Sequence, residues 1–246
     1  MSTLLLLSGE KIPTKMRISG LQKLTLLDFP NLVACTIFLP GCQFRCPFCQ
    51  NSSLVTDIAS ENEIDETEIF KYLKSRVGII DGVCVTGGEP TLQSDLKDFI
   101  KKIKELGFKV KLDTNGYNPY ILKELLDHSL LDYVAMDIKN SLKKYANTCG
   151  IKSLNIENIL SSIKILKECN IPYEFRTTVI KEFHAKEDFI EIAKLIKGVK
   201  TYYLQGYRDS DTCIKPGFHA YSREELNYFV DILKKEGINT EIRGVD

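Results

Sequence analysis

Three cysteines, Cys42, Cys46 and Cys49, lie within eight residues of each other. Thiolate sulfur is a soft ligand that selects zinc, copper(I) or iron–sulfur clusters, and this CxxxCxxC spacing lets one loop wrap a single inorganic centre. A structural zinc ion takes four protein ligands, and neither Cys nor His follows where a fourth ligand is expected. Three ligands favour a four-iron cluster with one iron open to a substrate, and a zinc site is the alternative.

A second candidate site is the turn Thr86-Gly87-Gly88-Glu89-Pro90. The two glycines let the backbone approach a ligand closely and adopt a positive φ, and the Glu89 carboxylate can accept hydrogen bonds from an ammonium group. The turn alone is a weak indication of function. Its place after a strand, one unit beyond the cysteine loop, strengthens it.

The other five cysteines separate into two groups. Cys35, Cys84 and Cys169 lie inside apolar periodic segments, where buried structural cysteines are expected. Cys149 and Cys213 lie in predicted loops, and the sequence leaves their roles open.

Apolar, β-branched runs alternate with amphipathic helical stretches from about residue 32 to the end. Such repeats predict a parallel sheet covered by helices, with the ligand site at the carboxyl ends of the strands. A partial, open (β/α)6 barrel and a doubly wound sheet both fit six strand-then-helix units. Strands are expected at 33–39, 83–86, 109–112, 133–138, 174–180, 201–205 and 240–243. Helices are expected at 65–77, with Asp65 as N-cap, and at 92–106, 119–127, 156–168, 186–196 and 223–235.

Composition narrows the classes of partner. The 246 residues carry 33 basic and 33 acidic side chains, so the electrostatic footprint of a nucleic-acid-binding protein is missing. The early apolar run Leu4 to Leu7 is too short for a signal peptide or a membrane span. We therefore expect a cytoplasmic protein with reduced thiols and no membrane partner.

We also expect one domain over 1–246, with a small N-terminal β cap at about 16–31 and a core at about 32–246.

The cysteine loop, with Phe48 just before its third cysteine, resembles the signature of the radical S-adenosylmethionine superfamily. The resemblance implies a partial TIM-like barrel in which Cys42, Cys46 and Cys49 hold a [4Fe–4S] cluster. It also implies that Phe48 and Asn51 contact S-adenosylmethionine, which the cluster cleaves reductively to methionine and a 5′-deoxyadenosyl radical. The protein would orient and shield this cofactor chemistry.

Gly87, Gly88 and Glu89 resemble the GGE motif of the same superfamily, which implies contact with the amino group of S-adenosylmethionine.

The next two strands end in Asp113-Thr114-Asn115-Gly116 and Met136-Asp137-Ile138-Lys139. These segments resemble elements of the glycyl-radical-enzyme activases, which implies that Lys139 and Asp137 contact S-adenosylmethionine. It also implies a monovalent cation site at Asp113, Thr114 and Asp137. Arg176 matches an arginine that reaches the S-adenosylmethionine carboxylate, for which a guanidinium is chemically suited. A salt bridge to a neighbour such as Glu174 is the alternative role.

The segment 20–30 and the final Ile242-Arg243-Gly244-Val245 are similar to the activating proteins of anaerobic ribonucleoside-triphosphate reductase. The resemblance implies an oxidoreductase that forms a glycyl radical on that partner enzyme, with flavodoxin or ferredoxin as electron donor. Gln50 and Gln205 depart from the pattern, because related activases usually carry His there.

Three alternatives remain. The first is activation of pyruvate formate-lyase or another glycyl radical enzyme. The second is radical chemistry on a small molecule, as in 7-carboxy-7-deazaguanine synthase. The third is a zinc-stabilised binding module without catalysis.

Overall fold

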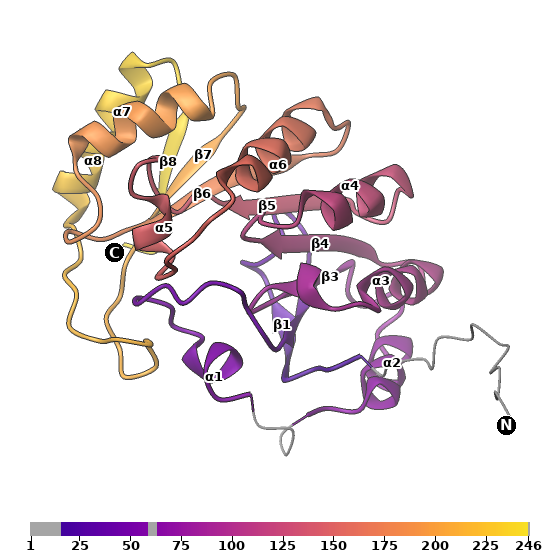
Figure 1. Ribbon diagram of the computed structural model, residues 1–246. Helices are drawn as coiled ribbons and strands as arrows, with labels where there is room; N and C mark the ends of the chain where they lie inside the picture. The colour runs from indigo at the N-terminus through magenta and orange to yellow at the C-terminus, as the bar shows by residue number, and fades with distance from the viewer. Residues whose placement is uncertain (1–15, 59–62, 246) are drawn as a thin grey trace, which may run out of the picture.

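One sheet of eight strands follows the order of the chain from β1 to β8 in the computed structural model, which describes residues 16–58 and 63–245 (Figure 1). All neighbours from β2 to β8 are parallel. A doubly wound sheet reverses its order at a switch point, so the sequential order excludes it. Within the described residues β1 does not pair with β8, and the predicted partial barrel is confirmed. The strands are β1 (Gly20–Thr25), β2 (Ala34–Leu39), β3 (Gly82–Gly87), β4 (Lys109–Thr114), β5 (Tyr133–Asp137), β6 (Tyr173–Val179), β7 (Tyr202–Gly206) and β8 (Thr240–Arg243).

The predicted N-terminal β cap contributes β1, which pairs antiparallel with β2 and forms an edge of the main sheet. The register between the two strands shifts between Gln22 and Thr25. The early run Leu4 to Leu7 lies outside the described residues. No helix among the described residues is both long and apolar enough to cross a membrane.

Among residues 16–58 and 63–245, six longer helices follow the strands as predicted, and two short ones, α1 and α5, were not predicted. Asp65 caps α2 by accepting a hydrogen bond from the backbone of Thr67, as expected. The predicted helix at 92–106 begins later, because a 3-10 turn, η2 (Pro90–Leu92), precedes it. The helices are α1 (Ser52–Val55), α2 (Glu66–Lys74), α3 (Leu96–Glu105), α4 (Pro119–Asp127), α5 (Tyr145–Thr148), α6 (Ile156–Glu168), α7 (Lys186–Leu195) and α8 (Arg223–Lys235).

The two faces of the sheet differ in chemistry, because successive side chains of a strand point to opposite faces. In β4, Val110 and Leu112 are fully buried members of the hydrophobic core, whereas Lys111 and Asp113 form an ion pair with each other. Glu174 of β6 is also buried, and its carboxylate pairs with Arg243 of β8. The sequence predicts continuous apolar strands, but the face away from the main core carries charged groups.

Candidate functional site

A cavity of about 420 Å³ lies where the carboxyl ends of β2 to β7 meet. Every predicted site residue except Glu89 lines it, although these residues come from segments up to 134 positions apart (176 − 42). This convergence is expected, because the carboxyl ends of parallel strands meet at the same edge of the sheet. The lining residues are Asp28, Cys42, Phe44, Cys46, Phe48, Cys49, Gln50, Asn51, Val55, Thr86, Gly87, Gly88, Asp113, Thr114, Asn115, Asp137, Lys139, Arg176, Thr178 and Gln205.

Backbone hydrogen bonds hold the cysteine loop in place. The amide of Gly41 donates to the carbonyl of Leu54 over 2.7 Å, which closes the loop at its start. On the other side, the amide of Lys215 donates to the carbonyl of Pro47 over 2.7 Å. The loop that follows β7 thus braces the cysteine loop, and the thiols keep their positions without help from a helix or strand of their own.

The surroundings of Cys42 show how each thiol is placed. Its sulfur accepts hydrogen bonds from the Phe44 amide, at 3.4 Å, and from Asn115 Nδ2, at 3.7 Å. Burial raises the pKa of the Cys42 thiol to about 12. Burial likewise raises the pKa of Cys49, whereas the pKa of Cys46 is lowered, first of all by a hydrogen bond from the side chain of Cys149. Within the described residues no three His, Cys, Asp or Glu side chains are arranged to hold a single metal ion.

Gly87 and Gly88 are required by the close approach of the cysteine loop. A Cβ at Gly87 would lie 2.2 Å from the Leu39 carbonyl oxygen, and one at Gly88 would lie 2.0 Å from that of Gly41. Backbone bonds join the same segments, since the Glu89 amide donates to the Gly41 carbonyl over 2.6 Å. The close approach expected for a ligand is thus made by the protein's own backbone, which ties the two candidate motifs together.

Glu89 is fully buried behind the cavity wall. Its Oε1 accepts hydrogen bonds from the hydroxyls of Thr91, at 2.6 Å, and Thr114, at 2.8 Å, and its Oε2 accepts one from the Asn115 amide, at 2.7 Å. Burial raises the pKa of Glu89 above its ordinary value of 4.5, although these hydrogen bonds oppose the shift. The carboxylate joins the end of β4 to η2, and Glu89 is not among the residues that line the cavity.

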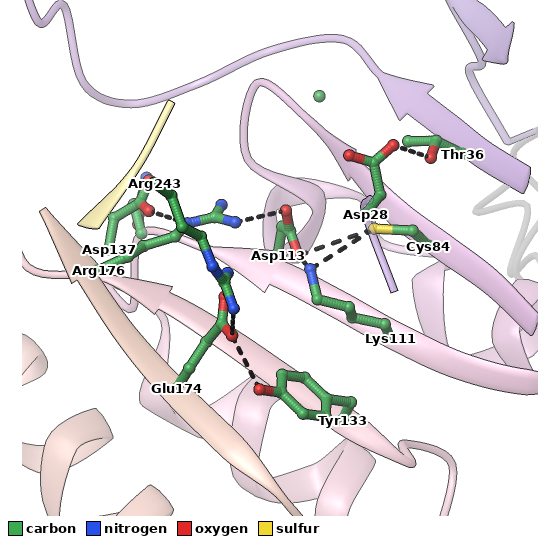
Figure 2. A network of polar contacts seen from close by, with 12 residues as sticks. Asp28, Thr36, Cys84, Lys111, Asp113, Tyr133, Asp137, Glu174, Arg176 and Arg243 are labelled. Carbon is green, nitrogen blue, oxygen red and sulfur yellow. Dashed lines mark hydrogen bonds and ion pairs between the residues drawn. The ribbon is translucent and has the colours of Figure 1, made fainter. Parts of the chain in front are cut away.

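Arg176 joins two carboxylates at the floor of the cavity (Figure 2). Its Nε lies 2.5 Å from Asp137 Oδ1, and its Nη1 lies 2.9 Å from Asp113 Oδ2. Lys111 pairs with the other oxygen of Asp113. Glu174, the alternative partner named for Arg176, instead contacts Arg243 and Tyr133. The guanidinium therefore belongs to the cavity.

Lys139 completes this charged group from the end of β5, with Nζ 2.8 Å from Asp137 Oδ2. Burial alone would raise the pKa values of Asp113 and Asp137, but Arg176 and the neighbouring lysines outweigh it and lower both. Three carboxylates, Asp28, Asp113 and Asp137, line the cavity with the two cations Lys139 and Arg176. The guanidinium and the ammonium group present hydrogen-bond donors that suit a ligand carboxylate.

The predicted monovalent cation residues are only partly brought together. Asp113 and Asp137 share Arg176, but the Thr114 hydroxyl donates to Glu89. A cation at this position would have to displace the ammonium and guanidinium groups already paired with the carboxylates.

The remaining predicted residues line the cavity near the cysteine loop. Phe48 packs its ring 5.5 Å from that of Phe183, and Asn51 Nδ2 donates to the Gly87 carbonyl over 3.2 Å. Gln50 Nε2 donates to the Arg208 carbonyl over 2.5 Å, so this residue ties the loop after β7 to the cysteine loop. Gln205 lines the cavity at the end of β7.

Sequence reasoning missed several residues in or beside the cavity, among them Asn115, Lys111 and Cys149. Asn115 follows the two residues chosen from its own motif, so the motif could have identified it. Lys111 lies two residues before Asp113 on the same strand. A lysine inside an apolar strand is unusual, and this could have identified Lys111 from the sequence. Cys149 gives no such signal, because only the fold brings it beside Cys46.

Comparison with known proteins places the geometry in context. The family model described as the Radical SAM superfamily matches residues 36–196. A protein of Methanocaldococcus jannaschii, provisionally named a glycyl-radical enzyme activating enzyme, is 35% identical over 201 residues, which are 80% of this chain and 82% of that protein. The pyruvate formate-lyase-activating enzyme of Clostridium pasteurianum is 28% identical over 219 residues, which are 86% of this chain and 88% of that protein.

A solved structure has the same fold. The radical SAM methyltransferase from Sphaerobacter thermophilus superposes with a TM-score of 0.70 over 90% of this chain and 68% of its own, at 14% sequence identity.

Proposed function

Because this chain belongs to the radical SAM superfamily, we propose that it is an activase that installs a glycyl radical on a partner enzyme. The observation that carries the proposal is the 35% identity, over 80% of the chain, to a relative provisionally named for that activity. The family implies a [4Fe–4S] cluster and S-adenosylmethionine as cofactors.

The residues around the cavity fit these cofactors. Three thiols line one cavity, and cysteine thiolates are the protein ligands that hold iron–sulfur clusters. The cavity volume of about 420 Å³ lies within the usual range for small-molecule sites. We propose that Cys42, Cys46 and Cys49 ligate the cluster and leave one iron free.

The charged floor of the cavity supports a role in binding the cofactor's methionine moiety. Arg176 and Lys139 can recognise its carboxylate with charged hydrogen-bond donors, while Asp113 and Asp137 orient them. Gly87, Gly88, Phe48 and Asn51 line the rest of the pocket. A [4Fe–4S] cluster held by these thiols would supply the electron for reductive cleavage of S-adenosylmethionine, and so the radical that takes a hydrogen atom from glycine. The protein's part is to hold the reacting groups together and keep water away.

A protein loop is the substrate that an open barrel favours. In the described part of the chain the sheet is not closed between β1 and β8, so a polypeptide can approach from a side that a full barrel would block. Anaerobic ribonucleoside-triphosphate reductase is the proposed partner, because the N-terminal segment 20–30 resembles its activating proteins. Flavodoxin or ferredoxin is the proposed electron donor, and the reaction is that of an oxidoreductase.

The experiment is to reconstitute the cluster anaerobically, add reductant, S-adenosylmethionine and the reductase, and record electron paramagnetic resonance spectra. We expect a glycyl radical signal on the reductase, and none when the activase carries Cys46→Ala. Pyruvate formate-lyase serves as the competing substrate.

Two outcomes would redirect the assignment. A radical on pyruvate formate-lyase alone would retain the activase and change its partner. Cleavage of S-adenosylmethionine with a modified small molecule and no protein radical would replace the activase with small-molecule radical chemistry.

A further inference from the structure

Lys111 is a buried lysine of β4 that serves the cavity without lining it. Its exposed fraction is 2%, and it is not among the residues that line the cavity. Side chains two residues apart on a strand point to the same face, so Lys111 lies beside Asp113. Figure 2 shows its side chain extending to Asp113, where the ammonium group pairs with Oδ1. Lysine is almost never so deeply buried unless it is paired, and here Asp113 is the partner.

Each carboxylate oxygen of Asp113 and Asp137 has a cationic partner. Lys111 holds Oδ1 of Asp113, and Arg176 Nη1 lies 2.9 Å from its Oδ2. Arg176 Nε lies 2.5 Å from Asp137 Oδ1, and Lys139 Nζ lies 2.8 Å from Asp137 Oδ2. A sodium or potassium ion binds to proteins through oxygen atoms. Side-chain cations of the protein itself already hold all four of these oxygens.

The hydroxyl of Thr114, the third residue expected to bind a monovalent cation, is also engaged by the protein. It donates a hydrogen bond to Glu89 Oε1 over 2.8 Å and accepts one from the Gly116 amide over 3.0 Å. The expected ligand set for a cation is therefore divided between the charged floor and the buried Glu89.

We propose that the Lys111 ammonium group takes the place of the monovalent cation expected beside Asp113, so that binding of S-adenosylmethionine needs no sodium or potassium ion. An ammonium group is a compact single positive charge with three donors. Paired with it, Asp113 keeps its second oxygen on Arg176, which the proposed function assigns to the cofactor carboxylate. Lys111 is thus a positioning residue. The inference deepens the proposed function and rests on it for the identity of the ligand.

A tethered ammonium group and a free ion differ in a measurable way. The occupancy of an ion site depends on the concentration of the ion, whereas Lys111 is always present. Removing the ammonium group leaves a buried carboxylate oxygen of Asp113 uncompensated, which a small cation in the vacated space would neutralise. The wild-type protein should therefore be indifferent to the cation in the buffer, and a variant without the ammonium group should depend on it.

The first measurement titrates the anaerobically reconstituted wild-type protein with S-adenosylmethionine by calorimetry. The buffer contains sodium, potassium or tetramethylammonium chloride at equal ionic strength. We expect the Kd values to agree within about twofold, because no ion is needed beside Asp113. A Kd that is lower by more than this in sodium or potassium would overturn the inference. This comparison needs no variant, so it decides the question even if a substitution at Lys111 prevents folding.

The second measurement repeats the titrations with Lys111→Ala and with a matched control, Lys104→Ala. Lys104 pairs with Asp132 at 2.6 Å, away from the residues that line the cavity. In tetramethylammonium chloride we expect Lys111→Ala to bind S-adenosylmethionine about tenfold more weakly than the wild type, and sodium or potassium to tighten its binding by about threefold or more. Lys104→Ala should match the wild type in each salt. Weak binding by Lys111→Ala that neither ion improves would overturn the inference.

Sodium-23 nuclear magnetic resonance supplies a readout that does not depend on the cofactor. Lys111→Ala should broaden the sodium line more than the wild type and Lys104→Ala do, and potassium should reverse the excess. Equal line widths for the three proteins would overturn the inference and leave the proposed function standing. A wild-type protein that binds no S-adenosylmethionine would overturn the proposed function, and the sodium line widths would still decide the role of Lys111.

Discussion

The cysteine loop and the charged floor of the cavity lie side by side but are held by different forces. Main-chain hydrogen bonds to neighbouring segments hold the cysteine loop, from Gly41 to Leu54 of α1 and from Lys215 to Pro47. Ion pairs between side chains on adjacent strands hold the floor, with Arg176 between Asp113 and Asp137. Side chains of the cysteine loop are therefore free to serve a cofactor, whereas those of the floor also stabilise the barrel.

Mutations in the two regions should therefore differ in their effect on stability: small in the cysteine loop and large in the charged floor. A ligand thiol can be removed with little effect on stability, because the main chain of its loop is unchanged. Removing one partner of a buried ion pair leaves an uncompensated charge, which costs far more than a surface pair.

The largest effect on function is expected for Cys46→Ala. This substitution removes one of three proposed ligands, so cluster content and S-adenosylmethionine cleavage should both be lost. The free energy of unfolding of the cluster-free protein should change by only about 1 kcal/mol. Iron analysis, cleavage assays and urea denaturation check the three quantities, and an intact four-iron cluster in this variant would refute the ligand assignment.

The largest effect on stability is expected for Arg176→Gln. The variant leaves Asp113 and Asp137 with one lysine each, Lys111 and Lys139. We expect a loss of about 3 kcal/mol in the free energy of unfolding at neutral pH, the lower end for a broken buried pair. Urea denaturation measures it, and a loss below about 1 kcal/mol would show that the floor does not stabilise the barrel.

The pH dependence of stability should also differ between the wild-type protein and Arg176→Gln. The folded-state pKa values of Asp113 and Asp137 lie below the ordinary 3.8, so their stabilisation is complete above that pH and is lost as the pH falls through the folded values. Without Arg176 these pKa values rise toward 3.8. The stability gap between wild type and Arg176→Gln should therefore narrow below pH 3.8, and a constant gap would assign the loss to packing.

A smaller change at the cysteine loop is expected for Gly88→Ala. Its Cβ would clash with the Gly41 carbonyl oxygen, and backbone must shift to make room. Gly20→Ala on β1 is the control, because its Cβ would have no neighbour closer than 3.4 Å. We expect Gly88→Ala to lower cluster loading at least twofold in iron analysis, with Gly20→Ala unchanged; equal loading in both variants would show that the two motifs are not coupled.

The smallest effect is expected for the exposed pair of Lys123 and Asp127 on α4, which is 2.8 Å long. Lys123→Ala should alter the free energy of unfolding by no more than about 0.5 kcal/mol. A loss comparable to that of Arg176→Gln would contradict the distinction between buried and exposed pairs.

Much of this fold could be predicted from the sequence, because local patterns specify it. Runs such as Val110 and Leu112 on β4, with Asp65 capping α2, give the order of strands and helices. The spacing of Cys42, Cys46 and Cys49 is likewise local. The contacts of Arg176 with Asp113 and Asp137 are not, because they depend on which strands become neighbours.

Glu89 shows the limit most clearly. Its motif indicates a residue at the site, but the sequence does not reveal which way the side chain points. In the structure, the carboxylate accepts hydrogen bonds from η2 and the end of β4 and lies behind the cavity wall. A side chain's direction depends on backbone conformation and on partners distant in sequence, and neither is visible in a motif.

The central claim is that the cysteine loop and the charged floor together hold one cofactor, with the open iron of a [4Fe–4S] cluster bound to S-adenosylmethionine. Electron–nuclear double resonance on the reduced, reconstituted protein with ¹⁵N-amino-labelled S-adenosylmethionine tests it most directly. The account predicts a ¹⁵N hyperfine coupling to the cluster, weakened or lost in Arg176→Gln. An intact four-iron cluster that shows no such coupling in the wild-type protein would contradict it.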